Sequence, residues 1–264
     1  MNLFELAANS QVFFLLFARI ILITFTAPLI GSQGIPAIAK IGLAFMTAYV
    51  VFPWVSADLY PLPETGLGYV AMLVGEGLIG LIIGLFMTLI FAAFQTSGQF
   101  FSLQMGFGAS QVFDPLSQVE IPLLGQYFNL VAMFVFIATN SFNRLFFIGV
   151  FRSFEAVRAV DVLTQTQALA SLMMTSLAGM FQTALIISLP VLGTLVVVNI
   201  SLGLMAKAAP QMNLLMLGFP VSILTAFVII FMALPLLVGA FDAVIETGWN
   251  ALMRLFTIYA GARS

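Results

Sequence analysis

The sequence predicts an all-α membrane protein, and three observations lead to this fold class. Hydrophobic residues make up 62% of the 264 residues and charged residues only 7%, and the mean hydropathy is +1.17. A soluble globular chain has about 25% charged and about 45–50% apolar residues. Long intervals without an ionisable side chain separate the charges, for example between Glu76 and Asp114. So few charges cannot cover the surface of a soluble chain of this length.

Charge-free intervals and apolar runs predict six long helices. We expect them at about residues 11–30, 38–57, 67–95, 122–142, 168–204 and 213–241, since a spanning helix needs about 20 apolar residues. Pro190 lies inside the fifth helix, and Pro220 and Pro235 lie inside the sixth. Proline removes a backbone hydrogen bond, so these two helices are expected to be kinked or broken. Residues 98–107 could form a further short helical piece. With no linker and no second compositional regime, we expect a single domain, residues 1–264.

Two regions outside these helices show amphipathic periodicity. In the first, one helical face carries Phe147, Phe151, Phe154 and Val157, and another largely carries Arg152, Glu155 and Arg158. This pattern predicts an amphipathic extension of the fourth helix. The C-terminal sequence WNALMRLFTIYA also has helical periodicity and suits an interfacial helix or one that packs on a partner.

Two of the charges within the apolar segments are candidate functional residues, Arg19 and Glu76. Arg19 costs about 2.5–3.5 kcal/mol at a helix centre, but each Leu, Ile, Phe or Val around it returns about 0.3–0.6 kcal/mol, so the segment can still insert. Arg19 either positions the helix by snorkelling or is a functional charge, in an internal salt bridge or facing a pore. Glu76 lies at the membrane edge or is paired inside the bundle, and only its charge suggests Arg19 as the partner. Gly80 and Gly84 form a small-xxx-small pair that predicts close helix packing.

Several classes of function are disfavoured by what the chain lacks. It has no His and no Cys, which removes the usual nucleophile–base pairs and zinc motifs. We therefore expect no catalytic residues, no metal and no cofactor. The net charge of −2 and the scattered Lys and Arg predict no binding of nucleic acid.

Four short motifs occur in a fixed order. They are Gln104-Met105-Gly106, Asp114-Pro115, Ala209-Pro210-Gln211 and Gly218-Phe219-Pro220. In this order, and with the length and apolar rhythm of the whole chain, they resemble the FliR/SctT family, the membrane export-gate subunit of the flagellar type III secretion apparatus. The chain departs from the family at Gly98-Gln99, where members often have Gly-Glu, and at Asn140-Ser141-Phe142, where they often have Asn-Gly-His. Roles tied to that acid or that histidine are not transferred.

The resemblance implies a non-enzymatic subunit of the flagellar basal body in the bacterial inner membrane. It implies assembly with FliP and FliQ into a helical pore for unfolded flagellar proteins, contact with FlhB, and helices arranged as hairpins against neighbouring subunits. An injectisome subunit of the same family is the closest alternative. A secondary transporter or channel, which also uses broken helices and intramembrane charges, is the alternative from another class.

The resemblance also implies a plug in the pore, formed by the loop from Gly106 to about Pro122. The residues that we assign to it are Met105, Gly106, Phe107, Gly108, Val112, Phe113, Asp114 and Pro115. Glycines permit unusual dihedral angles, Asp-Pro favours a turn, and an aromatic–aliphatic cluster can close a pore by dewetting. The alternative is an ordinary solvent-facing loop.

Overall fold

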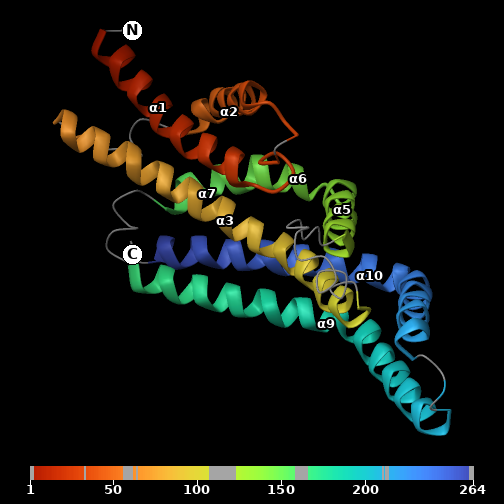
Figure 1. Ribbon diagram of the computed structural model, residues 1–264. Helices are drawn as coiled ribbons and strands as arrows, with labels where there is room; N and C mark the ends of the chain where they lie inside the picture. Colours follow the sequence, from red (N-terminus) through yellow and green to blue (C-terminus); the bar gives the residue numbers. More distant parts are fainter. Residues whose placement is uncertain are drawn as a thin grey trace. The chain divides into compact units, whose positions relative to one another are not determined.

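The computed structural model describes residues 3–32, 34–55, 62–63, 65–106, 123–157, 166–209, 211 and 214–261. Within these ranges the protein is helical and has no strand, which confirms the all-α class (Figure 1). Among the described residues, five helices are long and apolar enough to cross a membrane. In a bilayer, helices satisfy their own backbone hydrogen bonds, so a chain of this composition folds as helices.

The six predicted helices are all present, with different ends. They are α1 (Leu3–Thr26), α2 (Ala37–Val51), α3 (Gly66–Gln104), α5 (Leu123–Ala138), α9 (Thr166–Ala208) and α10 (Leu214–Gly261). α1 ends at Thr26 rather than near residue 30, because Pro28 restricts the residue before it and Leu29 has a φ of 75°. Residues 98–104 are helical, as expected, but they form the end of a continuous α3 rather than a further short piece.

The fourth predicted helix is shorter than expected. α5 has 16 residues and ends at Ala138, because Asn140 adopts a left-handed conformation with a φ of 55°. At about 1.5 Å per residue α5 is shorter than the hydrocarbon core, about 30 Å thick. The predicted amphipathic extension follows it as α6 (Ser141–Asn143), a π-helix (Arg144–Gly149) and α7 (Val150–Ala156).

The prolines do not break the long helices. α9 continues through Pro190, and α10 continues through Pro220 and Pro235 to include the C-terminal periodic segment. We expected these helices to be kinked or broken at their prolines, and the structure shows that they are not broken. Each proline removes one hydrogen bond, while the remaining backbone groups have no competing water partners within a bilayer.

Contacts divide the chain into two compact units, each with its own core. Unit 1 comprises 1–90, 137–177 and 245–264, and unit 2 comprises 91–136 and 178–244. Several long helices therefore contribute residues to both units, and the assignment of a single domain stays a prediction. In unit 1, α1 lies alongside the first part of α3, where Thr88 Oγ1 donates a hydrogen bond to the carbonyl of Thr26 (2.9 Å) (Figure 1).

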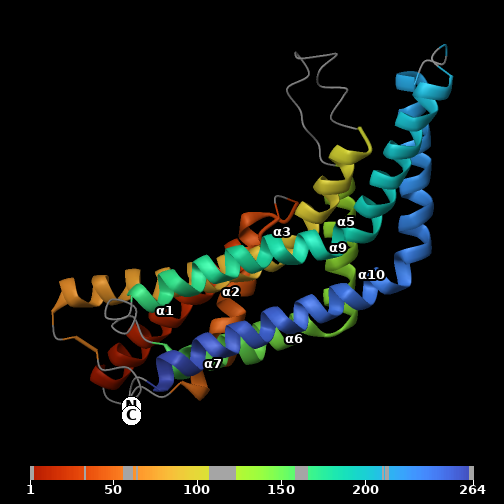
Figure 2. The ribbon, with the colours of Figure 1, turned by 90° about the horizontal axis from the view of Figure 1, so that it is seen from below.

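The core of unit 2 is aromatic. Phe94 and Phe101 of α3, Phe128 of α5 and Phe241 of α10 are all buried. Their ring centroids lie 4.4 Å apart for Phe94 and Phe241, 5.0 Å for Phe101 and Phe128, and 5.7 Å for Phe128 and Phe241. Such tilted and edge-to-face contacts add about 0.5–1.5 kcal/mol per pair beyond the burial of area. In the same unit, α9 and α10 lie side by side, as both views show (Figure 2).

α3 and α5 cross at two glycines in unit 2. A Cβ atom added to Gly98 would lie 2.5 Å from the Cα atom of Gly125 and 2.6 Å from its backbone nitrogen. These atoms belong to a helical backbone and cannot move aside as a flexible side chain can. The small size of both residues therefore sets the distance between the two helices.

We expect Gly98→Ala to destabilise unit 2 by about 1–3 kcal/mol, the usual cost of overpacking. Gly193→Ala is the matched control, since Gly193 lies inside α9 in the same unit and a Cβ atom there meets nothing within 4 Å. It should leave stability unchanged or raise it. Thermal unfolding of the purified protein in detergent measures both variants, and equal midpoints would contradict the close crossing.

Candidate functional site

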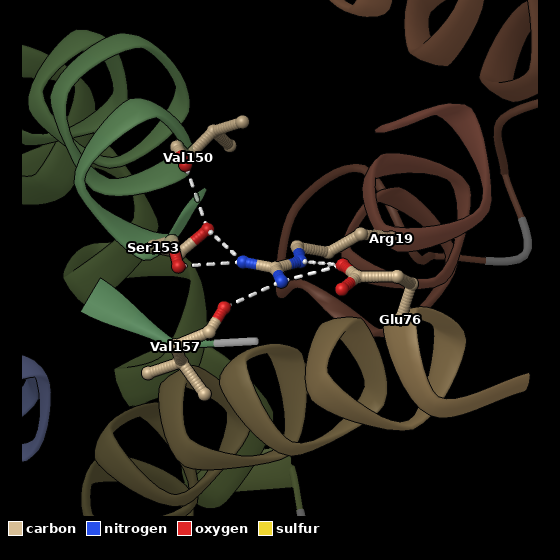
Figure 3. A network of polar contacts seen from close by, with 5 residues as sticks. All are labelled: Arg19, Glu76, Val150, Ser153 and Val157. Atoms are coloured by element: carbon tan, nitrogen blue, oxygen red, sulfur yellow. Dashed lines mark hydrogen bonds and ion pairs between the residues drawn. The ribbon is translucent and has the colours of Figure 1, made fainter. Parts of the chain in front are cut away.

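A buried ion pair lies between α1 and α3 in unit 1 (Figure 3). Arg19 Nε donates a hydrogen bond to Glu76 Oε2 (2.7 Å), and Arg19 Nη2 lies 2.5 Å from the same oxygen. Both side chains are completely buried. The structure thus brings together the two intramembrane charges that the sequence paired only by their sign.

The same guanidinium also binds the C-terminal end of α7. Arg19 Nη1 donates to the backbone carbonyl of Ser153 (2.6 Å) and to its Oγ (3.1 Å), and Nη2 donates to the carbonyl of Val157 (2.7 Å). The last carbonyls of a helix lack intrahelical partners and carry a partial negative charge, which favours a cation there. Ser153 Oγ in turn donates to the carbonyl of Val150 (2.6 Å), which fixes its orientation. Figure 3 shows these partners converging on the guanidinium from α7 and α3.

The aromatic ring of Phe154 completes the surroundings of Arg19. The guanidinium carbon lies 4.1 Å from the ring centroid, within the range of a cation–π interaction. Arginine has five N–H donors, and a buried charge is tolerated only when it is paired and hydrogen-bonded. A carboxylate, a helix end and a ring face meet these needs here. Because Arg19 has no exposed surface within unit 1, the geometry favours an internal salt bridge over a charge facing a pore.

A row of glycines on α3 lets α1 approach closely enough for this pair to form. A Cβ atom on Gly80 would overlap the backbone carbonyl of Arg19, and one on Gly84 would overlap the side chain of Thr26. At Gly77 it would lie 3.0 Å from a methyl group of Leu22. Gly80 and Gly84 therefore lie at the α1–α3 contact, and the ion pair depends on it.

Lys40 is a buried charge to which the sequence assigned no role. Its side-chain nitrogen donates to the carbonyls of Gly31 (3.0 Å) and Ser32 (2.9 Å) and lies 5.4 Å from the ring centroid of Phe25. It thereby satisfies the backbone of the turn that follows α1. In the sequence, Lys40 follows shortly after the glycine and proline residues of that turn. This position was the signal that could have suggested its role.

Other polar partners also had no clear signal in the sequence. Ser153 is a single serine within an amphipathic segment, and Val157 takes part through its backbone carbonyl, which no side-chain pattern reveals. Arg144 pairs with Glu246 and lies 5.3 Å from the ring centroid of Trp249. Because this pair is more than one-third exposed, its contribution is small, about 0–1 kcal/mol.

The end of α3 is a second candidate site, in unit 2. Met105 is fully buried, and its N–H donates to the carbonyl of Phe101 (2.8 Å) as in a continuing helix. Gly106 has a φ of +88°, and its N–H donates to the carbonyl of Leu103 (3.1 Å). A Cβ atom on Gly106 would overlap the ring of Phe219. Two motifs that are 113 positions apart in the sequence (219 − 106) therefore meet here.

The remaining predicted site residues are only partly described. Gln104 is half-buried at the end of α3. Ala209 follows α9 and donates its N–H to the carbonyl of Met205 (2.8 Å), and Gln211 is exposed. A Cβ atom added to Gly218 would lie 3.8 Å from a methyl group of Leu202. Outside the described residues lie Phe107, Gly108, Val112, Phe113, Asp114, Pro115 and Pro210. Within the described ranges, no cluster of three or more acidic side chains could hold a metal ion.

This fold, with the Arg19–Glu76 pair buried between apolar helices, defines the class of the chain as an all-α membrane protein with several spanning helices. The particular family follows from comparison: the chain belongs to the bacterial export proteins, family 1, whose model matches residues 10–248.

Curated relatives extend the same likeness over most of the chain. The flagellar biosynthetic protein FliR of Bacillus subtilis (strain 168) is 30% identical over 91% of this chain and 94% of its own length. FliR of Borreliella burgdorferi is 29% identical over 76% of this chain and 75% of its own. FliR of Escherichia coli (strain K12) is 28% identical over 83% and 82%. The resemblance that the ordered motifs indicate is thereby confirmed.

Proposed function

We propose that this chain is the FliR-like subunit of a flagellar protein export gate in the bacterial inner membrane. The observation that carries the proposal is the family match over residues 10–248, together with relatives that are named for flagellar biosynthesis. The flagellar names of these relatives favour flagellar export over the injectisome alternative. In this role the chain is a non-enzymatic part of the basal body.

The distribution of apolar surface supports assembly with other chains. α9 and α10 are apolar on nearly all sides, and large side chains such as Phe231 and Leu204 are 79% and 66% exposed. Such surfaces need lipid or apolar partner helices to cover them. FliP and FliQ homologues are the partners that we propose, with FlhB as a further contact and unfolded flagellar proteins as the cargo.

Co-expression tests the assembly. We expect the chain to co-purify with FliP and FliQ homologues from the same genome and to be unstable without them. A transporter or channel would instead purify alone and bind a small solute. A stable monomer that never co-migrates with these partners would therefore contradict the export-gate function.

We further propose that the segment from Gly106 to about Pro122 is the pore plug. The family resemblance supports this proposal, and so does the left-handed conformation of Gly106, which ends α3 at the start of the segment. The aromatic and aliphatic residues that we assign to closure are Phe107, Val112 and Phe113. Apolar side chains of this kind can form a hydrophobic constriction that closes by dewetting.

Deletion of residues 108–114, or replacement of Phe107, Val112 and Phe113 by glycine, should make the assembled complex leak. The reason is that an apolar constriction excludes water and ions only while its side chains fill the pore. Release of a small dye from proteoliposomes measures the leak, with the unaltered complex as control. Unchanged permeability in a fully assembled variant would refute the plug.

A further inference from the structure

We propose that Phe219 is a latch that holds the end of α3 in its observed conformation by covering Gly106. The latch consists of described residues of unit 2 alone: Met105 and Gly106 at the end of α3, and Phe219 in the second turn of α10. The contact between the motifs Gln104-Met105-Gly106 and Gly218-Phe219-Pro220 thereby has a conformational role.

The α3 side of the latch is a turn with little freedom. Met105 is fully buried and keeps the helical hydrogen bond to Phe101, so the helix is anchored up to this residue. One residue later the backbone turns, with Gly106 at a φ of +88°. Side chains other than glycine rarely adopt this conformation, and αL residues of this kind commonly end helices. The direction in which the chain leaves α3 is therefore set at Gly106.

The α10 side of the latch is the ring of Phe219, which covers Gly106. The ring edge of Phe219, at Cδ1 and Cε1, occupies the space in which a Cβ atom of Gly106 would stand. Phe219 is half-buried within the chain. Pro220 directly follows Phe219 within α10 and has no backbone N–H to donate to the helix. The neighbouring Gly218 makes only ordinary van der Waals contact with Leu202 of α9.

The consequence is a coupling between α10 and the end of α3. The ring of Phe219 packs against Gly106, so a change in the dihedral angles of the turn would disrupt this contact. When α10 moves the ring away, the turn is released. This inference rests on the proposed function, because the released turn matters for export only if the segment that follows is the plug.

A cysteine pair tests the latch in the assembled complex. The chain has no cysteine of its own, so Gly106→Cys with Phe219→Cys introduces a single possible disulfide. The added Cβ atom at position 106 lies 3.6 Å from Cγ of Phe219. Cγ is one bond from Cβ, and a disulfide needs Cβ atoms about 3.5–4.5 Å apart. We expect the bond to form under mild oxidation, secretion of flagellar proteins to stop, and secretion to return on reduction.

Phe219→Ala provides the second variant, in case Gly106→Cys disturbs folding. It should leave assembly intact and raise the leak of a small dye severalfold, and Phe219→Leu should leave the leak near that of the unaltered complex. The latch is wrong if no disulfide forms in the assembled complex, if the bond forms and secretion continues, or if Phe219→Ala does not leak.

The deletion of residues 108–114 distinguishes failure of the latch from failure of the plug. If the deletion leaks while the oxidised cysteine pair still secretes, the plug stands and the latch fails. If the deletion does not leak, the plug fails, and the latch fails with it, because the latch acts on export only through that segment.

Discussion

Glu76→Leu is expected to lower the free energy of unfolding by about 3–5 kcal/mol, because it leaves the guanidinium of Arg19 buried without its counter-charge. Arg19 has no exposed surface through which water could compensate. The thermal midpoint of the detergent-solubilised complex measures the loss. Recovery of the complex after extraction gives an independent measure, since a chain with an unpaired buried charge should assemble poorly.

The double variant Arg19→Met with Glu76→Leu distinguishes a paired charge from a merely large side chain. Replacing a buried ion pair by apolar residues of similar volume is often close to neutral. Here recovery should be incomplete, because the carbonyls of Ser153 and Val157 lose their donor, at about 1–3 kcal/mol for an unsatisfied buried group. The single variant Arg19→Met completes the comparison. If the loss of stability in the double variant equalled the sum of the losses in Glu76→Leu and Arg19→Met, the pair would not be coupled.

Gly80→Ala should have the second largest effect, about 1–3 kcal/mol. The added methyl group would overlap the carbonyl of Arg19, so the axes of α1 and α3 must move apart. Separation of the two helices would also stretch the bond between Arg19 and Glu76, so the loss should lie at or above the upper end of that range.

Gly42→Ala is the matched control for this variant. Gly42 lies within α2 of the same unit, and an added Cβ atom there meets nothing within 4 Å. Alanine is a better helix former than glycine by about 1 kcal/mol, so the control should be neutral or stabilising. Comparable losses for the two variants would show that the α1–α3 contact is not set by Gly80.

Much of the fold could be predicted because the patterns concerned are local. The composition determined the class, and the charge-free intervals located each long helix. The helix ends were less accurate, since they depend on single residues such as Leu29 and Asn140 that adopt left-handed conformations. Sequence periodicity does not reveal those dihedral angles.

The sites were predictable only in part. Gly80 and Gly84 had the spacing of a packing motif, and Arg19 and Glu76 were notable as charges in apolar surroundings. Which charges pair depends on the registry of α1 against α3, and registry results from packing. The role of Ser153 depends on where α7 ends relative to α1, which no local pattern encodes.

The amino-acid composition predicts an all-α membrane protein with long helices, and the ordered motifs indicate the export family. Composition suffices for the fold class, because the transfer of each side chain into a bilayer depends mainly on that side chain. Short ordered motifs suffice to indicate the family. The tertiary structure alone decided that Arg19 is paired internally with Glu76 and the end of α7, and that Phe219 covers Gly106. Both contacts join residues far apart in the sequence, and close packing of helices is the physical cause that brings them together.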